Sequence, residues 1–219
     1  MLTIWTTCWV AAQESEVRNV GSFRGIKSAE AVDVYLKKGT KESVRVEVSG
    51  TDLSNVITEV SGSYLRIHMS RGSFKRTNVK AYVTYVQLEK ISASSASSVF
   101  SEGVIVTPSM EITVSSAAAV EVSLDADMVT ADVSSAGEII LEGRGKTFEV
   151  EASSAGDVDA YKLQSEQVTA RVSSAGSIKV MATKELDARA SSGGDIRYRG
   201  NPMKTNTDSS SGGSVKKSN

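Results

Sequence analysis

The 219-residue sequence contains one histidine, one cysteine and only 5% aromatic residues. Because its single histidine is His68, the chain lacks a histidine-rich metal site and most histidine-dependent catalytic triads. Its 25 Lys and Arg residues nearly balance its 26 Asp and Glu residues, and the two signs are mixed along the whole length. A nucleic-acid-binding protein normally shows a basic face, so the sequence predicts no nucleic-acid partner.

The first twelve residues, MLTIWTTCWVAA, are apolar but too few to cross a bilayer, which takes roughly 20 apolar residues in a helix. We interpret residues 1–12 as part of a secretory signal, with cleavage after Ala12 and a mature chain that starts at Gln13. A buried first strand and a lipidated Cys8 are the alternatives. The interpretation predicts a secreted, periplasmic or outer-surface protein with no membrane span, no cysteine and therefore no disulfide.

A short serine-rich phrase, Ser-Ser-Ala or Ser-Ser-Gly followed by a small residue, recurs seven times and is called the corner phrase below. The first serines of successive phrases are separated by 21, 19, 19, 20, 18 and 19 residues. A regular period near 20 indicates stacked repeats, and the prevalence of β-branched residues favours a β-solenoid over a leucine-rich repeat. The first serines are Ser94, Ser115, Ser134, Ser153, Ser173, Ser191 and Ser210.

The residue five positions after each first serine is always Val or Ile, which predicts a buried column through the repeats. Before the phrases, apolar residues alternate with polar ones, as Val150 and Ala152 do with Glu151. Alternation with period two is typical of strands with one buried and one solvated face. The sequence therefore predicts an all-β fold, a parallel and right-handed β-helix with one coil per repeat and coils stacked at ~4.8 Å.

The corner phrase is expected to form a tight corner in each coil. Continuing the alternation places the second serines inside, as a stacked hydroxyl ladder from Ser95 to Ser211. The glycines that follow in most phrases, such as Gly156, are expected to allow positive φ or a close approach to the next coil. A catalytic serine occurs once and needs a base beside it, so the repetition favours a structural role.

Residues 13–88 lack the corner phrase but still alternate like strands, for example in Val44-Arg45-Val46-Glu47-Val48. A solenoid needs a covered end, because an unpaired flat strand edge promotes aggregation. We therefore interpret residues 13–88 as an N-terminal β-rich cap or the first coils, residues 89–216 as the β-helix repeats, and residues 217–219 as a tail.

Several of these segments resemble one known family, the auto-transporter adhesins with a head GIN domain, which occur in Bacteroidetes. The resemblance covers roughly residues 20–219 and implies a secreted or surface-exposed all-β protein with adhesion as its expected role. The matching segments are Phe23-Arg24-Gly25-Ile26, Val32-Asp33-Val34-Tyr35-Leu36 with Lys38-Gly39, Val46-Glu47-Val48, Leu65-Arg66-Ile67 and the corner phrases.

Few residues qualify as metal or cofactor ligands. Glu138 and Asp157 occupy equivalent positions in consecutive repeats, and oxygen ligands of this kind suit Ca²⁺. Two carboxylates are too few for a tight site, so a solvated turn is the simpler reading of this pair. The sequence has no Gly-rich phosphate loop between a strand and a helix, no Cys/His cluster and no serine with a histidine partner, which predicts no cofactor.

The leading functional hypothesis is a non-enzymatic module that presents its strand faces to a glycan or a surface protein. Exposed aromatics would form a glycan-binding surface, so Tyr82, Tyr85 and Phe100 are the candidate binding residues, with cap packing as the alternative role for Tyr82 and Tyr85. A β-helix polysaccharide lyase or hydrolase is the alternative function, and such enzymes cluster carboxylates on one sheet. The column six positions after the first serines, from Phe100 to Lys216, holds no two carboxylates on consecutive coils, which weakens that alternative.

Overall fold

The computed structural model of the protein describes residues 14–72 and 77–218. The predicted signal segment, with Cys8, and Gln13 lie outside the described residues. The described residues are nearly all-β, with 69% of them in strands. Within the described ranges the one helical element is the short 3-10 turn η1 (Leu53–Asn55). The same ranges contain no helix with the length and apolar character needed to span a bilayer.

The strands fall into an N-terminal group of short strands and a C-terminal group dominated by long, bent strands. The first group comprises β1 (Glu14–Arg18), β2 (Gly25–Ser28), β3 (Val32–Lys38), β4 (Ser43–Ser49), β5 (Val56–Ser61), β6 (Tyr64–Met69), β7 (Asn78–Tyr85) and β8 (Lys90–Ala93). The second group comprises β9 (Ser98–Val114), β10 (Ala119–Val133), β11 (Glu138–Ala152), β12 (Asp157–Val172), β13 (Ser177–Ala190), β14 (Asp195–Arg199), β15 (Lys204–Ser209) and β16 (Ser214–Lys217).

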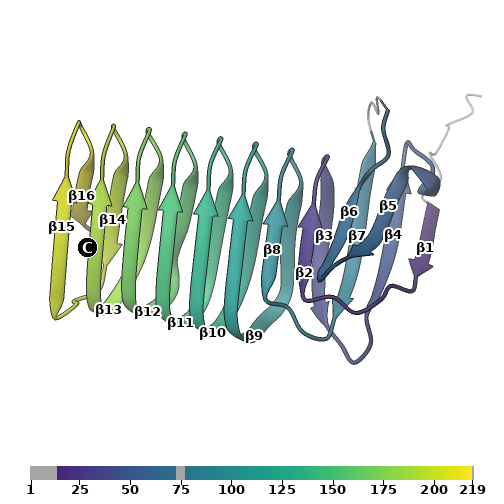
Figure 1. The fold of residues 1–219 in the computed structure, drawn as a ribbon, viewed down its shortest axis with the longest axis horizontal. Helices are drawn as coiled ribbons and strands as arrows, with labels where there is room; N and C mark the ends of the chain where they lie inside the picture. The colour runs from purple at the N-terminus through teal and green to yellow at the C-terminus, as the bar shows by residue number, and fades with distance from the viewer. Residues whose placement is uncertain (1–13, 73–76, 219) are drawn as a thin grey trace, which may run out of the picture.

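These strands form a parallel β-solenoid of about seven turns, which confirms the prediction of an all-β fold of stacked parallel coils. Each long strand leaves one tight turn, bends at the opposite edge and returns to the next turn, so one strand contributes to both faces of the solenoid (Figure 1). We call the two faces face I and face II. Along face I the order is β1-β4-β7-β3, then the first halves of β9 to β13, then β14 and β16. Along face II it is β5-β6-β2-β8, then the second halves of β9 to β13, then β15.

The interior is built from the predicted apolar columns. On face I, Val99, Val120, Ile139, Val158, Ile178 and Ile196 are buried, and Val215 of the last coil packs against them. On face II, inward positions such as Val150 and Ala170 are also buried, whereas the next residue of each strand, Glu151 or Arg171, points outward. The period-two alternation therefore assigned inside and outside correctly along both faces.

The corner phrase forms a tight turn, but its second serine does not point inward as we predicted. Ser135 and Ala136 are exposed and both have positive φ, 53° and 58°, the signature of a type I′ turn. The N–H of Gly137 donates to the carbonyl of Ser134 at 3.0 Å and closes the turn. Alternation resumes in the same phase at the fourth residue, which is buried, so the turn removes one inward position without shifting the pattern.

Stacked turns are joined by a ladder of backbone hydrogen bonds along the edge. The N–H of Ala136, for example, donates to the carbonyl of Ser154 in the next coil at 3.1 Å. Left-handed backbone costs about 1–2 kcal/mol per non-glycine residue, and these inter-coil bonds offset that cost. Glu30 and Ala31 form an equivalent turn without the phrase, with φ of 63° and 58°, and Ala31 donates to Ser95.

The glycines at the fourth position are required for packing rather than for positive φ. Gly156 does not have positive φ, and a Cβ there would lie 2.9 Å from the carbonyl oxygen and a methyl group of Val133. This confirms the expected close approach and corrects the expectation of left-handed backbone at these glycines. Positive φ falls one residue earlier, at the third position, where Gly193 has φ of 75°.

The N-terminal segment contributes coils and also an antiparallel edge. β2 and β3 lie in parallel register between β6/β7 on one side and β8/β9 on the other, so chain order and spatial order differ. β4 and β1 then pair antiparallel on face I, and β5 pairs antiparallel on face II. At the other end, β15 and β16 complete a last coil around the final corner phrase (Figure 1).

Candidate functional site

Face I carries a row of stacked aromatic side chains near its N-terminal end. Tyr82 of β7, Tyr35 of β3 and Phe100 of β9 lie directly opposite one another in the strand register and point outward. The Tyr35 ring centroid lies 5.1 Å from that of Tyr82 and 5.4 Å from that of Phe100, with nearly parallel planes. The guanidinium of Arg45 in β4 covers the free side of Tyr82 at 4.0 Å. We call Arg45, Tyr82, Tyr35 and Phe100 the aromatic row.

The aromatic row includes two of the three predicted binding residues and one that the sequence analysis missed. Tyr85 points inward and is only 4% exposed, and burial raises the pKa of its hydroxyl. Tyr35 was overlooked because it stands 47 residues before Tyr82 in the chain, and only the β3–β7 pairing makes them neighbours. Of the other aromatics near this segment, Tyr64 lies on face II below Lys27, and Phe74 lies outside the described residues.

Beyond Phe100 the same row becomes mostly charged, with Ile140 as its one apolar member among the described residues. The register continues through Glu121, Ile140, Asp159, Lys179, Arg197 and Lys216. Consecutive coils therefore carry no two carboxylates in this row, as the spacing predicted. Lys179 and Asp159 are paired across adjacent coils at 3.2 Å, which places opposite charges side by side in this row.

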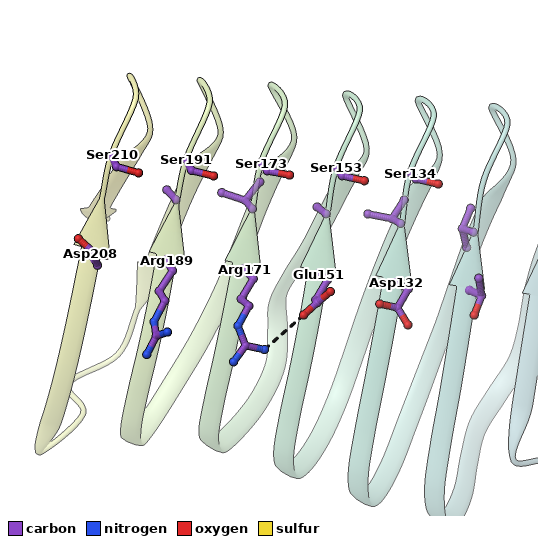
Figure 2. A pocket seen from close by; sticks show the side chains of 16 residues that line it. Asp132, Ser134, Glu151, Ser153, Arg171, Ser173, Arg189, Ser191, Asp208 and Ser210 are labelled. Atoms are coloured by element: carbon purple, nitrogen blue, oxygen red, sulfur yellow. Dashed lines mark hydrogen bonds and ion pairs between the residues drawn. The ribbon is translucent and has the colours of Figure 1, made fainter.

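Face II holds a groove of about 420 Å³ directly below the tight turns. Figure 2 shows its two parallel rows of side chains, one of first serines next to the turns and one of charged residues a step lower. The serine row contains Ser134, Ser153, Ser173, Ser191 and Ser210. The charged row contains Asp132, Glu151, Arg171, Arg189 and Asp208, one from each coil and in direct register.

The charges of the groove are arranged in blocks. Arg171 pairs with Glu151 of the preceding coil at 3.2 Å, and Arg189 pairs with Asp187 of its own strand at 3.2 Å. Partial burial raises the pKa of the Asp132 carboxyl, and the nearby carboxylates of Glu151 and Glu111 raise it further. Two arginines thus lie between a crowded acidic end and Asp208.

The weak metal candidate gains no further ligands. Glu138 and Asp157 are opposite each other on adjacent strands, as the repeat spacing predicted. Within residues 14–72 and 77–218, however, no group of three or more His, Cys, Asp or Glu side chains is placed to hold a metal ion. His68 is partly buried, with Nδ1 2.9 Å from the Met69 carbonyl oxygen.

The sequence profile of one family matches most of the chain. The family is described as "putative auto-transporter adhesin, head GIN domain", and the match covers residues 22–202. The chain belongs to this family. The resemblance inferred from the strand segments and corner phrases is therefore confirmed. No curated protein matches the chain.

Solved structures share the fold over nearly the whole chain. A putative adhesin from Bacteroides fragilis superposes with a TM-score of 0.88 at 20% identity, covering 95% of this chain and 98% of that one. A putative adhesin from Parabacteroides distasonis superposes with a TM-score of 0.74 at 22% identity, covering 95% of this chain and 98% of that one. A putative lipid binding protein from the same species superposes with a TM-score of 0.73 at 19% identity, covering 94% of this chain and 97% of that one. At these identities the likeness establishes the fold of this chain.

Proposed function

We propose that the chain is a non-enzymatic adhesin module that binds a glycan through the aromatic row of face I. The observation that carries the proposal is the line of three rings, Tyr82, Tyr35 and Phe100, on the outward side of three neighbouring strands. Aromatic side chains combine a broad apolar surface with, in Tyr, a polar tip that hydrogen-bonds at a wet boundary. A sugar ring presents both apolar C–H groups and hydroxyls, so it complements such a platform.

The fold itself does not demand aromatics at these positions. In the other coils the equivalent outward position holds residues such as Glu121, Asp159 and Arg197, and the core beneath is equally well packed. Membership of an adhesin family supports a binding role for an exposed surface. In this proposal residues 1–12 direct export, and residues 13–88 supply most of the aromatic row and cap the solenoid. Residues 89–216 extend the solenoid outside the cell, with its last strand continuing to Lys217.

The test is a glycan-array screen of residues 13–219, with Tyr35→Ala, Tyr82→Ala and Phe100→Ala as variants. Ile140→Ala, at the same row position in a later coil, is the matched control. We expect each aromatic variant to weaken a specific signal and the control to retain it. Equal binding by all variants, or the absence of any glycan or host-matrix signal, would overturn the proposal. Loss of signal in EDTA would refute the expectation that no cofactor is needed and would favour a cation bound by Glu138 and Asp157.

The polysaccharide lyase or hydrolase alternative receives no support from the family or from the solved structures. One feature of face II bears on it, because Asp132 and Glu151 are carboxylates on consecutive coils, with Arg171 next to them. Incubation with a polysaccharide panel, followed by assays for reducing ends and unsaturated products, tests this alternative. Turnover that Asp132→Asn abolishes would replace the adhesin proposal with an enzymatic one.

A further inference from the structure

The serine row of face II presents unused hydrogen-bonding groups at regular intervals. In the described part of the chain, the hydroxyls of Ser134, Ser153, Ser173 and Ser191 take part in no intramolecular hydrogen bond. Each coil adds one hydroxyl, so neighbours are separated by about 4.8 Å along the solenoid axis. This spacing is close to the length that one sugar unit adds to an extended glycan. Each serine hydroxyl can both donate and accept a hydrogen bond, as sugar hydroxyls do.

The two arginines of the groove retain donors for a ligand. Arg171 and Arg189 are opposite each other on adjacent strands, and about half of each side chain is exposed, 53% and 54%. Each guanidinium has five N–H donors, and the pairs with Glu151 and Asp187 leave several of them unused. A ligand carboxylate above the two strands would accept from both guanidinium groups, which is the strong, charge-assisted type of hydrogen bond.

The acidic residues restrict what kind of anion fits. Asp132 and Glu151 lie on one side of the arginine pair and Asp208 on the other. A polymer with a negative charge on every unit, such as a nucleic acid or a polyuronate, would place charges against these carboxylates and be repelled. An isolated carboxylate with neutral, hydroxylated neighbours avoids this repulsion, because carboxylates accept hydrogen bonds from hydroxyls.

A glycan suits the groove better than a peptide. The backbone N–H and C=O groups of face II are already paired between coils, so an extended peptide cannot add to the sheet inside the groove. The accessible groups are hydroxyls, guanidiniums and carboxylates, and the apolar lining residues such as Val133 and Ala152 are almost fully buried. Anchors for apolar peptide side chains are therefore missing among the described lining residues.

We propose that the face II groove binds a glycan whose acidic sugars are isolated between neutral ones, with the carboxylate on Arg171 and Arg189 and the sugar hydroxyls on the serine row. The inference rests on the proposed function in taking the ligand to be a glycan, but it concerns a second site on the opposite face. A terminal sialic acid and a single uronic acid branch are two ligands of this class.

The test measures binding of 3′-sialyllactose and of a xylo-oligosaccharide with one glucuronic acid branch, by calorimetry at low salt. Lactose, the unbranched xylo-oligosaccharide and the carboxyl methyl esters are the neutral controls, and polygalacturonate is the uniformly charged one. We expect binding of at least one acidic probe, with every control about tenfold weaker or more. Added salt is expected to weaken binding of the acidic probe, because the contact between its carboxylate and the arginines is partly exposed to solvent.

The deciding variant is Arg171→Gln/Arg189→Gln, compared with Lys179→Gln/Arg197→Gln. The control pair is also cationic, lies on adjacent coils in register, and sits on face I. The groove variant is expected to lose about tenfold in affinity and the control to lose little, with both folded by thermal melts. Absence of binding by both acidic probes, equal binding of esters, or equal loss in the two variants would overturn the inference.

The outcomes separate this inference from the proposed function. Tyr35→Ala should leave the acidic probe bound, whereas the groove variant should leave an aromatic-row ligand bound. If Tyr35→Ala alone abolished binding of the acidic probe, the probe's site would be assigned to face I and the proposal of a groove site would be refuted. A second copy of the chain is the other occupant to examine, since the charge blocks are self-complementary. Dimers in light scattering that Arg171→Gln/Arg189→Gln dissociates would replace the glycan with a self-association face.

Discussion

The two faces of the solenoid share one interior but differ in what they expose. Face I ends in a row of stacked rings capped by Arg45, whereas face II carries a groove lined by serine hydroxyls and blocks of charge. Both faces are contributed by the same long strands, and inward residues such as Val158 and Ala170 are completely buried on each. The difference shows that coil stacking requires apolar residues at the inward positions, while the outward positions hold aromatic, polar or charged residues.

The largest expected effect comes from a charge in the shared interior. Val158→Asp on face I and Ala170→Asp on face II should each prevent folding, because an unpaired buried carboxylate costs more than a domain of this size can lose. Asp159→Lys, one residue away and outward, loses its pair with Lys179 and should cost about 1 kcal/mol or less. Thermal melts followed by circular dichroism compare the three. Equal melting temperatures would show that the register is wrong.

The turn that joins the faces should respond in opposite directions at two neighbouring positions. Gly156→Ala places a methyl group against Val133 and should destabilise the fold by about 2 kcal/mol. Ala155→Gly relieves a left-handed alanine with φ of 61° and should stabilise it by about 1 kcal/mol. Urea unfolding of both variants measures these changes. Changes in the free energy of unfolding that have the same sign in the two variants would contradict the turn geometry.

The outward rows should differ in how much they stabilise the fold. Tyr35→Ala removes two ring contacts and should cost about 1–2 kcal/mol. Ser153→Ala removes a hydroxyl without an intramolecular partner and should change stability by less than about 0.5 kcal/mol. Urea titrations of both variants give the comparison. A large loss in Ser153→Ala would mean that the serine row is structural rather than available to a ligand.

The smallest expected effect is a pH-dependent one at the acidic end of the groove. Because the pKa of Asp132 is raised by burial and then by Glu151 and Glu111, the folded state binds this proton more tightly than the unfolded chain. Its contribution to stability is present at low pH and is lost as the pH rises through the raised pKa. Asp132→Asn should therefore melt about 1 °C higher than the parent protein at pH 7.

The matching measurement repeats both melts near pH 3, below the ordinary pKa of aspartate. There the parent carboxyl is protonated in both states, so the advantage of Asp132→Asn should vanish. A constant difference at both pH values would show that the substitution acts through packing rather than through the charge of Asp132.

Much of the fold was predictable because it follows from local repetition. The column from Val99 to Val215 and the alternation around Glu151 and Arg171 identify the coils, since a parallel strand stack keeps each position in line with its equivalent. The inward serine ladder was wrong because alternation was extended through the turn, where Ser135 and Ala136 adopt left-handed backbone. A type I′ turn with Ser-Ala at its centre is not the Asn-Gly signal expected from sequence.

Sequence alone determined the solenoid, its inside and outside, and the family, because these depend on residues at fixed spacing along the chain. Tertiary structure alone decided the sites. Tyr35 and Tyr82 meet only because β3 inserts between β7 and β9, and the groove forms only because consecutive coils bring Glu151, Arg171 and Arg189 into one row beside the turns. The physical reason is that side chains on the outer faces contact neighbours from other coils, and in residues 13–88 no repeat spacing records which strands become neighbours.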